Sequence, residues 1–206
     1  MRRLVTSLTA TLLAGAAWVG PATTRLGAQA PAGPTQLQRP TADGRVFWGS
    51  LGMSVGRAAL TCRFCTEEAR SSYAGALAFG MRVRGRTRVG LELQGWRYAN
   101  TQATRRVYAA APVVQVYPWR QQPVFIKVGF GAASFSSSDG EDRLSNTSFA
   151  AIVGGGVEIP VTPNYVLTPY ITFLTGAGGS LRLNDDLVTH ASGVTLLQYG
   201  LAVALR

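Results

Sequence analysis

The sequence predicts an all-β fold, a closed antiparallel up-and-down barrel of eight strands, and three observations lead to this prediction. Beyond residue 44, large apolar residues alternate with small or polar ones at a period of two almost to the end of the chain. The same region contains no long amphipathic helix pattern and no apolar run of the ~20 residues that a membrane-spanning helix needs. The alternating stretches are separated by connections that are alternately long and short, as expected if the two kinds lie at opposite ends of an antiparallel barrel.

Composition and charge exclude several classes of protein. Hydrophobic residues are 47% and charged residues 15% of the 206 residues, whereas soluble domains carry about 25% charged residues, so intrinsic disorder is excluded. The formal net charge is +10, which on its own would suit a nucleic-acid partner. Basic and acidic residues are nevertheless segregated along the chain without forming a single basic face. We therefore expect no nucleic-acid partner.

The N-terminal segment has the pattern of an export signal. Two arginines follow the initial Met, an apolar stretch covers 4–19, and an Ala-x-Ala sequence ends at Ala30. The apolar stretch is too short and too rich in Ala, Thr and Gly for a membrane anchor. We expect residues 1–30 to be a cleaved signal peptide, 31–44 a flexible, proline-containing periplasmic leader, and 45–206 the barrel domain.

The barrel domain divides into eight expected strands. They cover 45–56, 73–84, 88–98, 106–119, 124–137, 148–161, 165–181 and 193–206. Long connections are expected at 57–72, 99–105, 138–147 and 182–192, and short ones at 85–87, 120–123 and 162–164. All the short connections fall at the end of the barrel that holds both chain termini. A ten-stranded barrel is the alternative, because 57–72 has room for a further hairpin.

Each strand has one large apolar face and one small face with a few charges. The large apolar members include Tyr73, Leu77, Phe79, Met81 and Val83 in 73–84, Val89, Leu91 and Leu93 in 88–98, Ile126, Val128 and Phe130 in 124–137, and Leu197, Tyr199, Leu201, Val203 and Leu205 in 193–206. Between them lie mainly Ala and Gly, with the occasional Gln, Glu or Lys. A soluble ligand-binding barrel would turn the apolar face inward, and a membrane barrel would turn it outward.

Three observations favour the outward orientation. The strands carry too few charges for a soluble exterior, and the narrow interior of an eight-stranded barrel suits Gly and Ala. Aromatic residues gather near strand ends, as in the interfacial girdles of membrane barrels. These aromatic residues are Trp48, Tyr73, Trp96, Tyr98, Tyr117, Trp119 and Tyr165. The predicted fold is therefore a closed antiparallel up-and-down transmembrane β-barrel.

The few charges on the small face predict ion pairs in the lumen. If 85–87 forms a three-residue turn, Arg82 and Glu92 become diagonal neighbours on the inner face. Lys127 and Glu158 lie on consecutive strands at similar distances from the short turns, and therefore at similar height. Pairing would relieve the cost of burying each charge. We expect these pairs to fill and orient the core; a gated proton or ion path is the alternative.

At this level the chain resembles the small eight-stranded outer-membrane β-barrel family, the OmpA/OmpX-like transmembrane barrels of the porin-like superfamily. The resemblance covers 45–206 and rests on the export signal, the eight strands, the short turns beside the termini and the last strand, GVTLLQYGLAVALR. It departs from the family at the end, where Leu205-Arg206 replaces the usual terminal aromatic residue. The resemblance implies insertion by the barrel-assembly machinery into the outer membrane of a Gram-negative, diderm bacterium, among outer-membrane lipid and lipopolysaccharide. We expect a monomer.

Two further motifs have candidate chemistry. Cys62 and Cys65 lie in the first long connection, and in an exported protein they predict a disulfide; free thiols, or a redox or metal role, are the alternatives. The only histidine, His190, precedes Ser192 by two residues, a pair that resembles the His-x-Ser of outer-membrane lipid A deacylases. No acidic residue follows Ser192 to orient such a base, so we expect a solvated loop histidine.

The sequence therefore predicts a non-enzymatic barrel with no catalytic residue, cofactor or metal site. The acidic run Asp139–Asp142 lacks the ligand spacing of a calcium loop and is expected to be solvated. The expected role is structural, or surface interaction through the four long extracellular loops. A soluble periplasmic lipocalin-like ligand-binding barrel and a lipid A-modifying barrel enzyme remain as alternatives.

Overall fold

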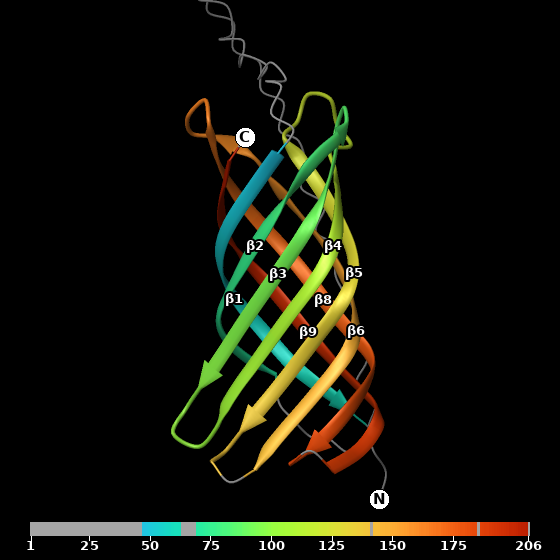
Figure 1. The fold of residues 1–206 in the computed structure, drawn as a ribbon. Coiled ribbons are helices and arrows are strands. Elements are labelled where there is room, and N and C mark those ends of the chain that lie inside the picture. The colour runs from blue at the N-terminus through green and yellow to red at the C-terminus, as the bar shows by residue number, and fades with distance from the viewer. Residues whose placement is uncertain (1–46, 63–68, 141, 185, 206) are drawn as a thin grey trace, which may run out of the picture. The chain divides into compact units, whose positions relative to one another are not determined.

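The computed structural model describes residues 47–62, 69–140, 142–184 and 186–205, and these form an all-β structure (Figure 1). Its strands are β1 (Phe47–Cys62), β2 (Arg70–Arg84), β3 (Thr87–Ala99), β4 (Thr104–Val116), β5 (Val124–Ser138), β6 (Arg143–Val157), β7 (Ile159–Pro160), β8 (Tyr165–Leu183) and β9 (Asp186–Leu205). Within the described ranges, no helix has the length and apolar character required to cross a membrane.

Eight long strands close into a barrel. Neighbours in the sequence pair antiparallel from β1 to β6, β6 then pairs with β8, β8 with β9, and β9 with β1. The short β7 pairs only with the start of β8. The predicted closed, antiparallel, up-and-down barrel of eight strands is confirmed.

Several strands extend beyond their predicted ends into three connections that were expected to be long, and these connections are therefore short. By contrast, β4 ends at Val116, three residues before its predicted end. Residues 100–103, 139–142 and 184–185 join β3 to β4, β5 to β6 and β8 to β9. The predicted strands end where apolar alternation ceases. Backbone pairing continues further because every ladder hydrogen bond forms regardless of side-chain polarity. In the fourth connection, β1 continues to Cys62 and β2 begins at Arg70.

The two ends of the barrel differ, and we name them by their residues. The terminal end holds the first residue of β1, the last residue of β9 and the connections 85–86 and 117–123. The distal end holds the connections 100–103, 139–142 and 184–185. In Figure 1 the terminal end is at the top and the distal hairpins are at the bottom.

The outer wall carries an apolar belt that begins at the terminal end. On β9, Leu197, Tyr199, Leu201, Val203 and Leu205 are all exposed, and the next outward residue toward the distal end is Thr195. Eight residue steps of a strand tilted by about 40° correspond to about 20 Å along the barrel axis, close to the ~25 Å apolar band of membrane barrels. The inward residues of the same strand, such as Ala202 and Ala204, are small and buried. The large apolar face therefore points outward, as predicted.

Several aromatic residues that were predicted to form an interfacial girdle instead point inward. Trp48 is 9% and Trp96 2% exposed, and the Trp96 ring stacks on Tyr98 at a centroid distance of 6.3 Å. By contrast, Tyr73 is 78% and Trp119 52% exposed on the outer surface. Proximity to a strand end does not determine the side of the wall, because successive residues of a strand alternate between its two faces.

Candidate functional site

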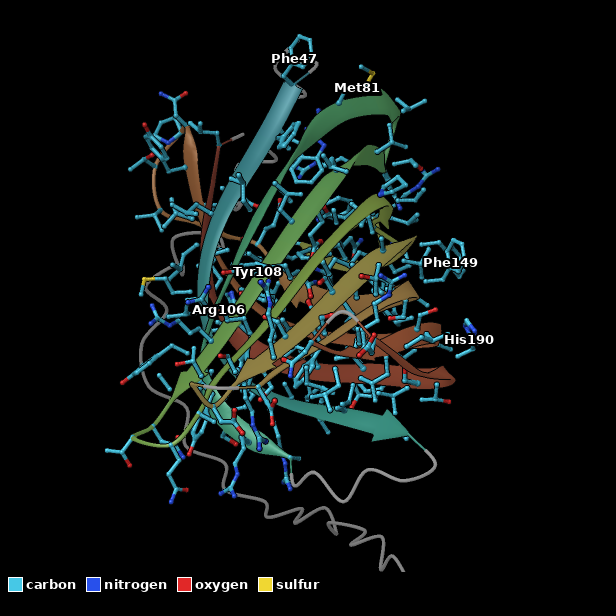
Figure 2. All side chains as sticks on the ribbon, turned by 60° about the horizontal axis from the view of Figure 1, so that its bottom comes forward. Phe47, Met81, Arg106, Tyr108, Phe149 and His190 are labelled. Atoms are coloured by element: carbon cyan, nitrogen blue, oxygen red, sulfur yellow. The ribbon has the colours of Figure 1, made fainter. Side chains whose placement is uncertain are left out.

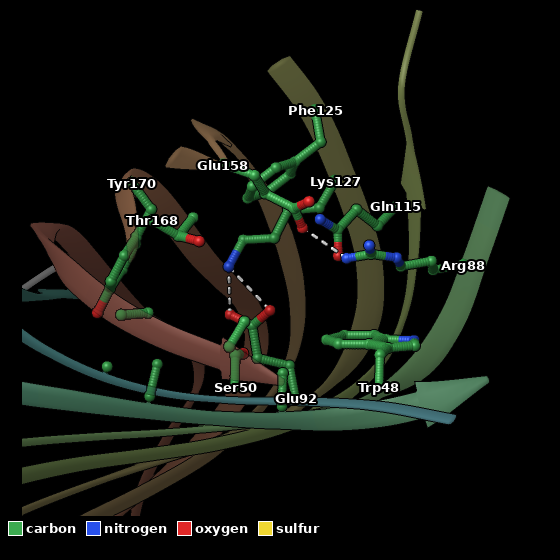
Figure 3. A pocket seen from close by; sticks show the side chains of 15 residues that line it. Trp48, Ser50, Arg88, Glu92, Gln115, Phe125, Lys127, Glu158, Thr168 and Tyr170 are labelled. Carbon is green, nitrogen blue, oxygen red and sulfur yellow. Dashed lines mark hydrogen bonds and ion pairs between the residues drawn. The ribbon is translucent and has the colours of Figure 1, made fainter. Parts of the chain in front are cut away.

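A layer of paired charges crosses the lumen near the terminal end. We call Arg88, Glu92, Lys127 and Glu158 the ionic layer. The Lys127 ammonium donates to both carboxylate oxygens of Glu92, at 2.7 Å to Oε1 and 2.8 Å to Oε2 (Figure 3). Gln94 Nε2 donates to Glu92 Oε1 at 2.7 Å. Glu92 is 2% and Lys127 8% exposed, so this pair is almost fully removed from solvent.

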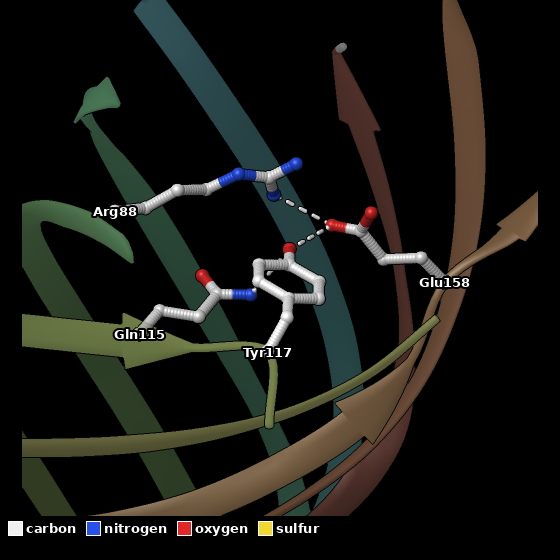
Figure 4. Close-up of polar contacts among 4 residues, drawn as sticks. All are labelled: Arg88, Gln115, Tyr117 and Glu158. Atoms are coloured by element: carbon white, nitrogen blue, oxygen red, sulfur yellow. Dashed lines mark hydrogen bonds and ion pairs between the residues drawn. The ribbon is translucent and has the colours of Figure 1, made fainter. Parts of the chain in front are cut away.

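The second pair of the ionic layer lies among aromatic rings. Arg88 Nη1 donates to Glu158 Oε1 at 2.6 Å, and the Tyr117 hydroxyl donates to the same oxygen at 2.5 Å (Figure 4). Gln115 Nε2 donates to the Tyr117 oxygen at 3.0 Å. The Arg88 guanidinium lies 4.9 Å from the centroid of the Tyr117 ring and 5.8 Å from that of Trp48. Glu158 thus receives donors from β3 and from the connection after β4.

Strand register explains why these side chains meet. Arg88 pairs with Gln115, Gln115 with Lys127, and Lys127 with Gly154, so a single rung of the sheet carries much of the polar layer. A Cβ atom at Gly154 would lie 2.9 Å from Cε of Lys127 and 2.6 Å from the Ile171 carbonyl oxygen. The glycine therefore provides the space across which the lysine stem reaches Glu92.

The structure brings Glu92, Lys127 and Glu158 into one layer, but the partners differ from those expected. Arg82 was expected beside Glu92; instead Arg82 is opposite Arg88, and Glu92 is opposite Ala78. The predicted register was wrong by two residues. The connection is a tight turn with Gly85 at φ 53°, and a register irregularity lies between Arg82 and Arg84. Ala78, the residue opposite Glu92, is four residues from Arg82 on β2, a separation of about 13 Å along the strand.

Arg88, Tyr117 and Trp48 belong to the lumen network but were not predicted to do so. A signal for Arg88 was available, because Arg88 and Glu92 are four residues apart in an alternating strand and must share a face. A comparable signal was available for Tyr117, because it lies two residues after Gln115 in the expected strand 106–119 and shares its face.

The space between these side chains is small. The lining residues of the lumen pocket include Trp48, Arg88, Glu92, Lys127 and Tyr170, and the cavity measures about 50 Å³. Ligand-binding cavities usually measure about 300–1,000 Å³, whereas one water molecule in the liquid takes about 30 Å³. The cavity is therefore of a size for water and not for an organic ligand.

The distal part of the lumen is filled by apolar side chains, which we call the apolar plug. Its largest members are Leu60, Trp96, Phe135, Ile152, Leu174 and Leu196, each at most 4% exposed. Trp96 Nε1 donates to the Gly56 carbonyl oxygen of β1 at 2.9 Å, so the polar group of the indole is satisfied. Within the described residues, the ionic layer and the apolar plug occupy the interior together with buried polar side chains such as Gln198 and Asn146.

The remaining sequence motifs do not assemble a second site. His190 belongs to β9 and not to a loop; its Nδ1 lies 3.2 Å from the Ser180 hydroxyl, while Ser192 contacts Asn146 and donates to the Gly179 carbonyl. Within the part of the chain that the structure describes, no group of three or more His, Cys, Asp or Glu residues is placed to hold a metal ion. Cys62 is the last residue of β1, and Cys65, its expected disulfide partner, lies outside the described residues.

The acidic residues at the distal end have a structural contact. Asp142 N–H donates to Asp139 Oδ1 at 3.0 Å, and Asn184 Nδ2 donates to Asp142 Oδ1 at 2.6 Å. Arg143 N–H also donates to Asn184 Oδ1, at 2.8 Å. These bonds join the β5–β6 connection to the β8–β9 connection.

Solved structures of other outer-membrane proteins have a similar architecture. Neisserial surface protein A (NspA) matches with a TM-score of 0.58 and 16% sequence identity, over 77% of this chain and 96% of that chain. Ail, the attachment invasion locus protein of Yersinia pestis (TM-score 0.46, 13% identity, 77% of this chain and 99% of that one), and OprG of Pseudomonas aeruginosa (0.45, 10%, 78% and 95%) match more loosely. No protein-family model matches the chain, and no curated protein matches its sequence significantly. The chain has the fold of the small eight-stranded outer-membrane β-barrels.

Proposed function

We propose that this protein is a non-enzymatic integral outer-membrane barrel with a closed lumen, acting as a structural element of the membrane and as a rigid platform at its surface. The observation that carries the proposal is the apolar belt. Phe79, Phe130 and Phe173 lie on different strands and are 49%, 74% and 45% exposed. Exposing such a continuous apolar surface to water is unfavourable, whereas lipid acyl chains can cover it.

The lumen supports a structural role over a transport role. The ionic layer joins β3 to β5 and to the residue that follows β6, so each charge ties two parts of the wall together. The apolar plug fills the distal half of the interior. A soluble lipocalin-like binder would need the reverse arrangement, with the large apolar side chains around an internal cavity.

We propose the following setting for the barrel. The export signal predicted for 1–30 directs the chain to the periplasm, the assembly machinery inserts it, and the terminal end stays on the periplasmic side. The distal end then faces the exterior. Because its described connections are short, contacts with other molecules would be made by the extended strand ends and tight hairpins there.

Heat-dependent gel mobility tests the proposal. Outer membranes are isolated, and the protein is run in SDS without and with boiling. A closed transmembrane barrel keeps its fold in SDS until heated, so we expect two mobilities and recovery in the detergent-extracted membrane fraction. Recovery in the soluble periplasmic fraction, with a single mobility, would contradict the proposal.

A further inference from the structure

Two arginines face each other on the outer wall just beyond the apolar belt. Arg97 of β3 and Arg106 of β4 are direct cross-strand partners, and both side chains are exposed. Figure 2 shows Arg106 beside Tyr108 on the barrel surface. Like charges directly opposite each other on one face of a sheet are destabilising unless an anion lies between them.

Among the residues that the structure describes, the neighbours of this pair along the same rung of the sheet supply no such anion. Arg106 is opposite Ser136, Ser136 opposite Ser145, and Ser145 opposite Arg182, also exposed. We call this row, from Arg97 to Arg182, the arginine rung. It contains three guanidinium groups and two hydroxyl groups but no carboxylate, and neither Arg97 nor Arg106 contacts a carboxylate of the described residues.

The depth of the arginine rung matches a lipid headgroup. On β4 the outward residues toward the terminal end of Arg106 are Tyr108, Ala110, Pro112, Val114 and Val116, which belong to the apolar belt. If the belt is embedded in a bilayer, the guanidinium groups lie at its distal interface. Arginine there can bind a phosphate through two parallel hydrogen bonds.

A hollow in the belt lies on the bilayer side of the rung. It is lined by small outward residues, among them Ala132 and Ala151, between the rings of Phe130 and Phe149, which are 74% and 84% exposed. Ala132 is four residues from Ser136 along β5, so the hollow begins about 13 Å from the rung. A lipid whose phosphate sits on the rung has its acyl chains at this depth.

We propose that Arg97 and Arg106 bind a phosphate group of a lipid in the distal leaflet, with an acyl chain of the same lipid in the hollow. The inference rests on the proposed membrane function. The lipid class that fits is a phosphorylated glycolipid of the lipid A type, because its headgroup carries separate phosphates and Arg182 lies on the same rung at a distance of three strands. Free phosphate fits less well, since it would leave the apolar hollow without a ligand.

The experiment uses the folded protein in phosphatidylcholine nanodiscs and diphosphoryl lipid A as the probe. The test variant is Arg97→Gln/Arg106→Gln. The matched control, Arg86→Gln/Arg120→Gln, removes two positive charges at the terminal end. A third variant, Ala132→Phe, fills the hollow and keeps both arginines. We expect the test variant to bind the probe about tenfold or more weakly, the control to bind it as the unaltered protein does, and Ala132→Phe to weaken binding.

Each outcome decides the matter. Equal binding by the test variant, or equal weakening by the control, would overturn the assignment to the arginine rung. Displacement of the probe by millimolar inorganic phosphate, together with no effect of Ala132→Phe, would show an anion site and reject the lipid. Heat-dependent mobility is measured on every sample first. A protein without the mobility shift would count against the membrane barrel itself, separately from the lipid site.

Discussion

Replacing Lys127 by Met should destabilise the barrel strongly, because it leaves the Glu92 carboxylate buried without its cation. Glu92 is 2% exposed and accepts hydrogen bonds at 2.7 and 2.8 Å from Lys127 and at 2.7 Å from Gln94. Lys127→Met removes the two charge-assisted bonds and keeps only the amide donor. Breaking a buried pair in this way costs about 3–5 kcal/mol, a large share of the ~5–15 kcal/mol by which domains are stable.

The double variant separates the loss of the pair from the loss of the charge. In Glu92→Gln/Lys127→Met no charge remains to be desolvated, and the Met side chain still occupies the space beside Gly154. We expect most of the stability to return, to within about 1–2 kcal/mol of the unaltered protein. Glu92→Gln alone leaves the ammonium unpaired and should be as damaging as Lys127→Met.

Urea unfolding in phospholipid vesicles, followed by the fluorescence of Trp48, Trp96 and Trp119 and by gel mobility, measures these differences. The reasoning is refuted if Lys127→Met costs less than about 1 kcal/mol, because the buried carboxylate would then have found another cation or water. It is also refuted if the double variant is as unstable as either single variant, since the loss would then come from packing and not from charge.

Three further perturbations test other parts of the structure by the same unfolding assay or by electrical recording. Tyr117→Phe removes the hydroxyl that donates to Glu158 at 2.5 Å and should cost about 1.5–3 kcal/mol, whereas Tyr165→Phe on the outer surface should cost almost nothing. Phe149→Arg places a charge on a lipid-facing site that is 84% exposed and should cost up to about 2–4 kcal/mol, against little for Thr101→Arg in the exposed connection 100–103; equal costs would mean that the belt is misplaced. In planar bilayers the protein should carry no steady ion current, because the apolar plug fills the lumen, and a persistent single-channel conductance would contradict this arrangement.

The strand count and the orientation of the wall could be read from the sequence because both depend only on period-two alternation. Inward placement of Glu92, Lys127 and Glu158 followed in the same way. Partner choice did not, because it depends on register, and one tight turn at Gly85 shifted Arg82 away from Glu92. A register shift of two residues leaves each side chain on the same face, so the alternating pattern cannot reveal such a shift.

The Glu92–Lys127 pair could not be predicted by considering only residues on neighbouring strands. Glu92 is on β3 and Lys127 on β5, with β4 between them. In a curved wall the inner side chains converge, so residues two strands apart can meet across the lumen. The connection lengths were predicted wrongly for a different reason. Residues such as Ser145 and Thr147 at the start of β6 pair with β5, but they lack the apolar alternation by which strands were recognised.

The position of the ionic layer in the chain has a consequence for the order of assembly. All four of its charges belong to the segment from β3 to the residue after β6, whereas the barrel closes through β1 and β9, from Gly49 opposite Leu205 to Cys62 opposite Ser192. Closure joins residues at opposite ends of the chain and is the entropically slow event. The charges can neutralise one another in a curved, still open sheet. The seam then closes mainly between small inward residues, such as Ser54 against Gly200, and no ion has to be stripped of water at the last step.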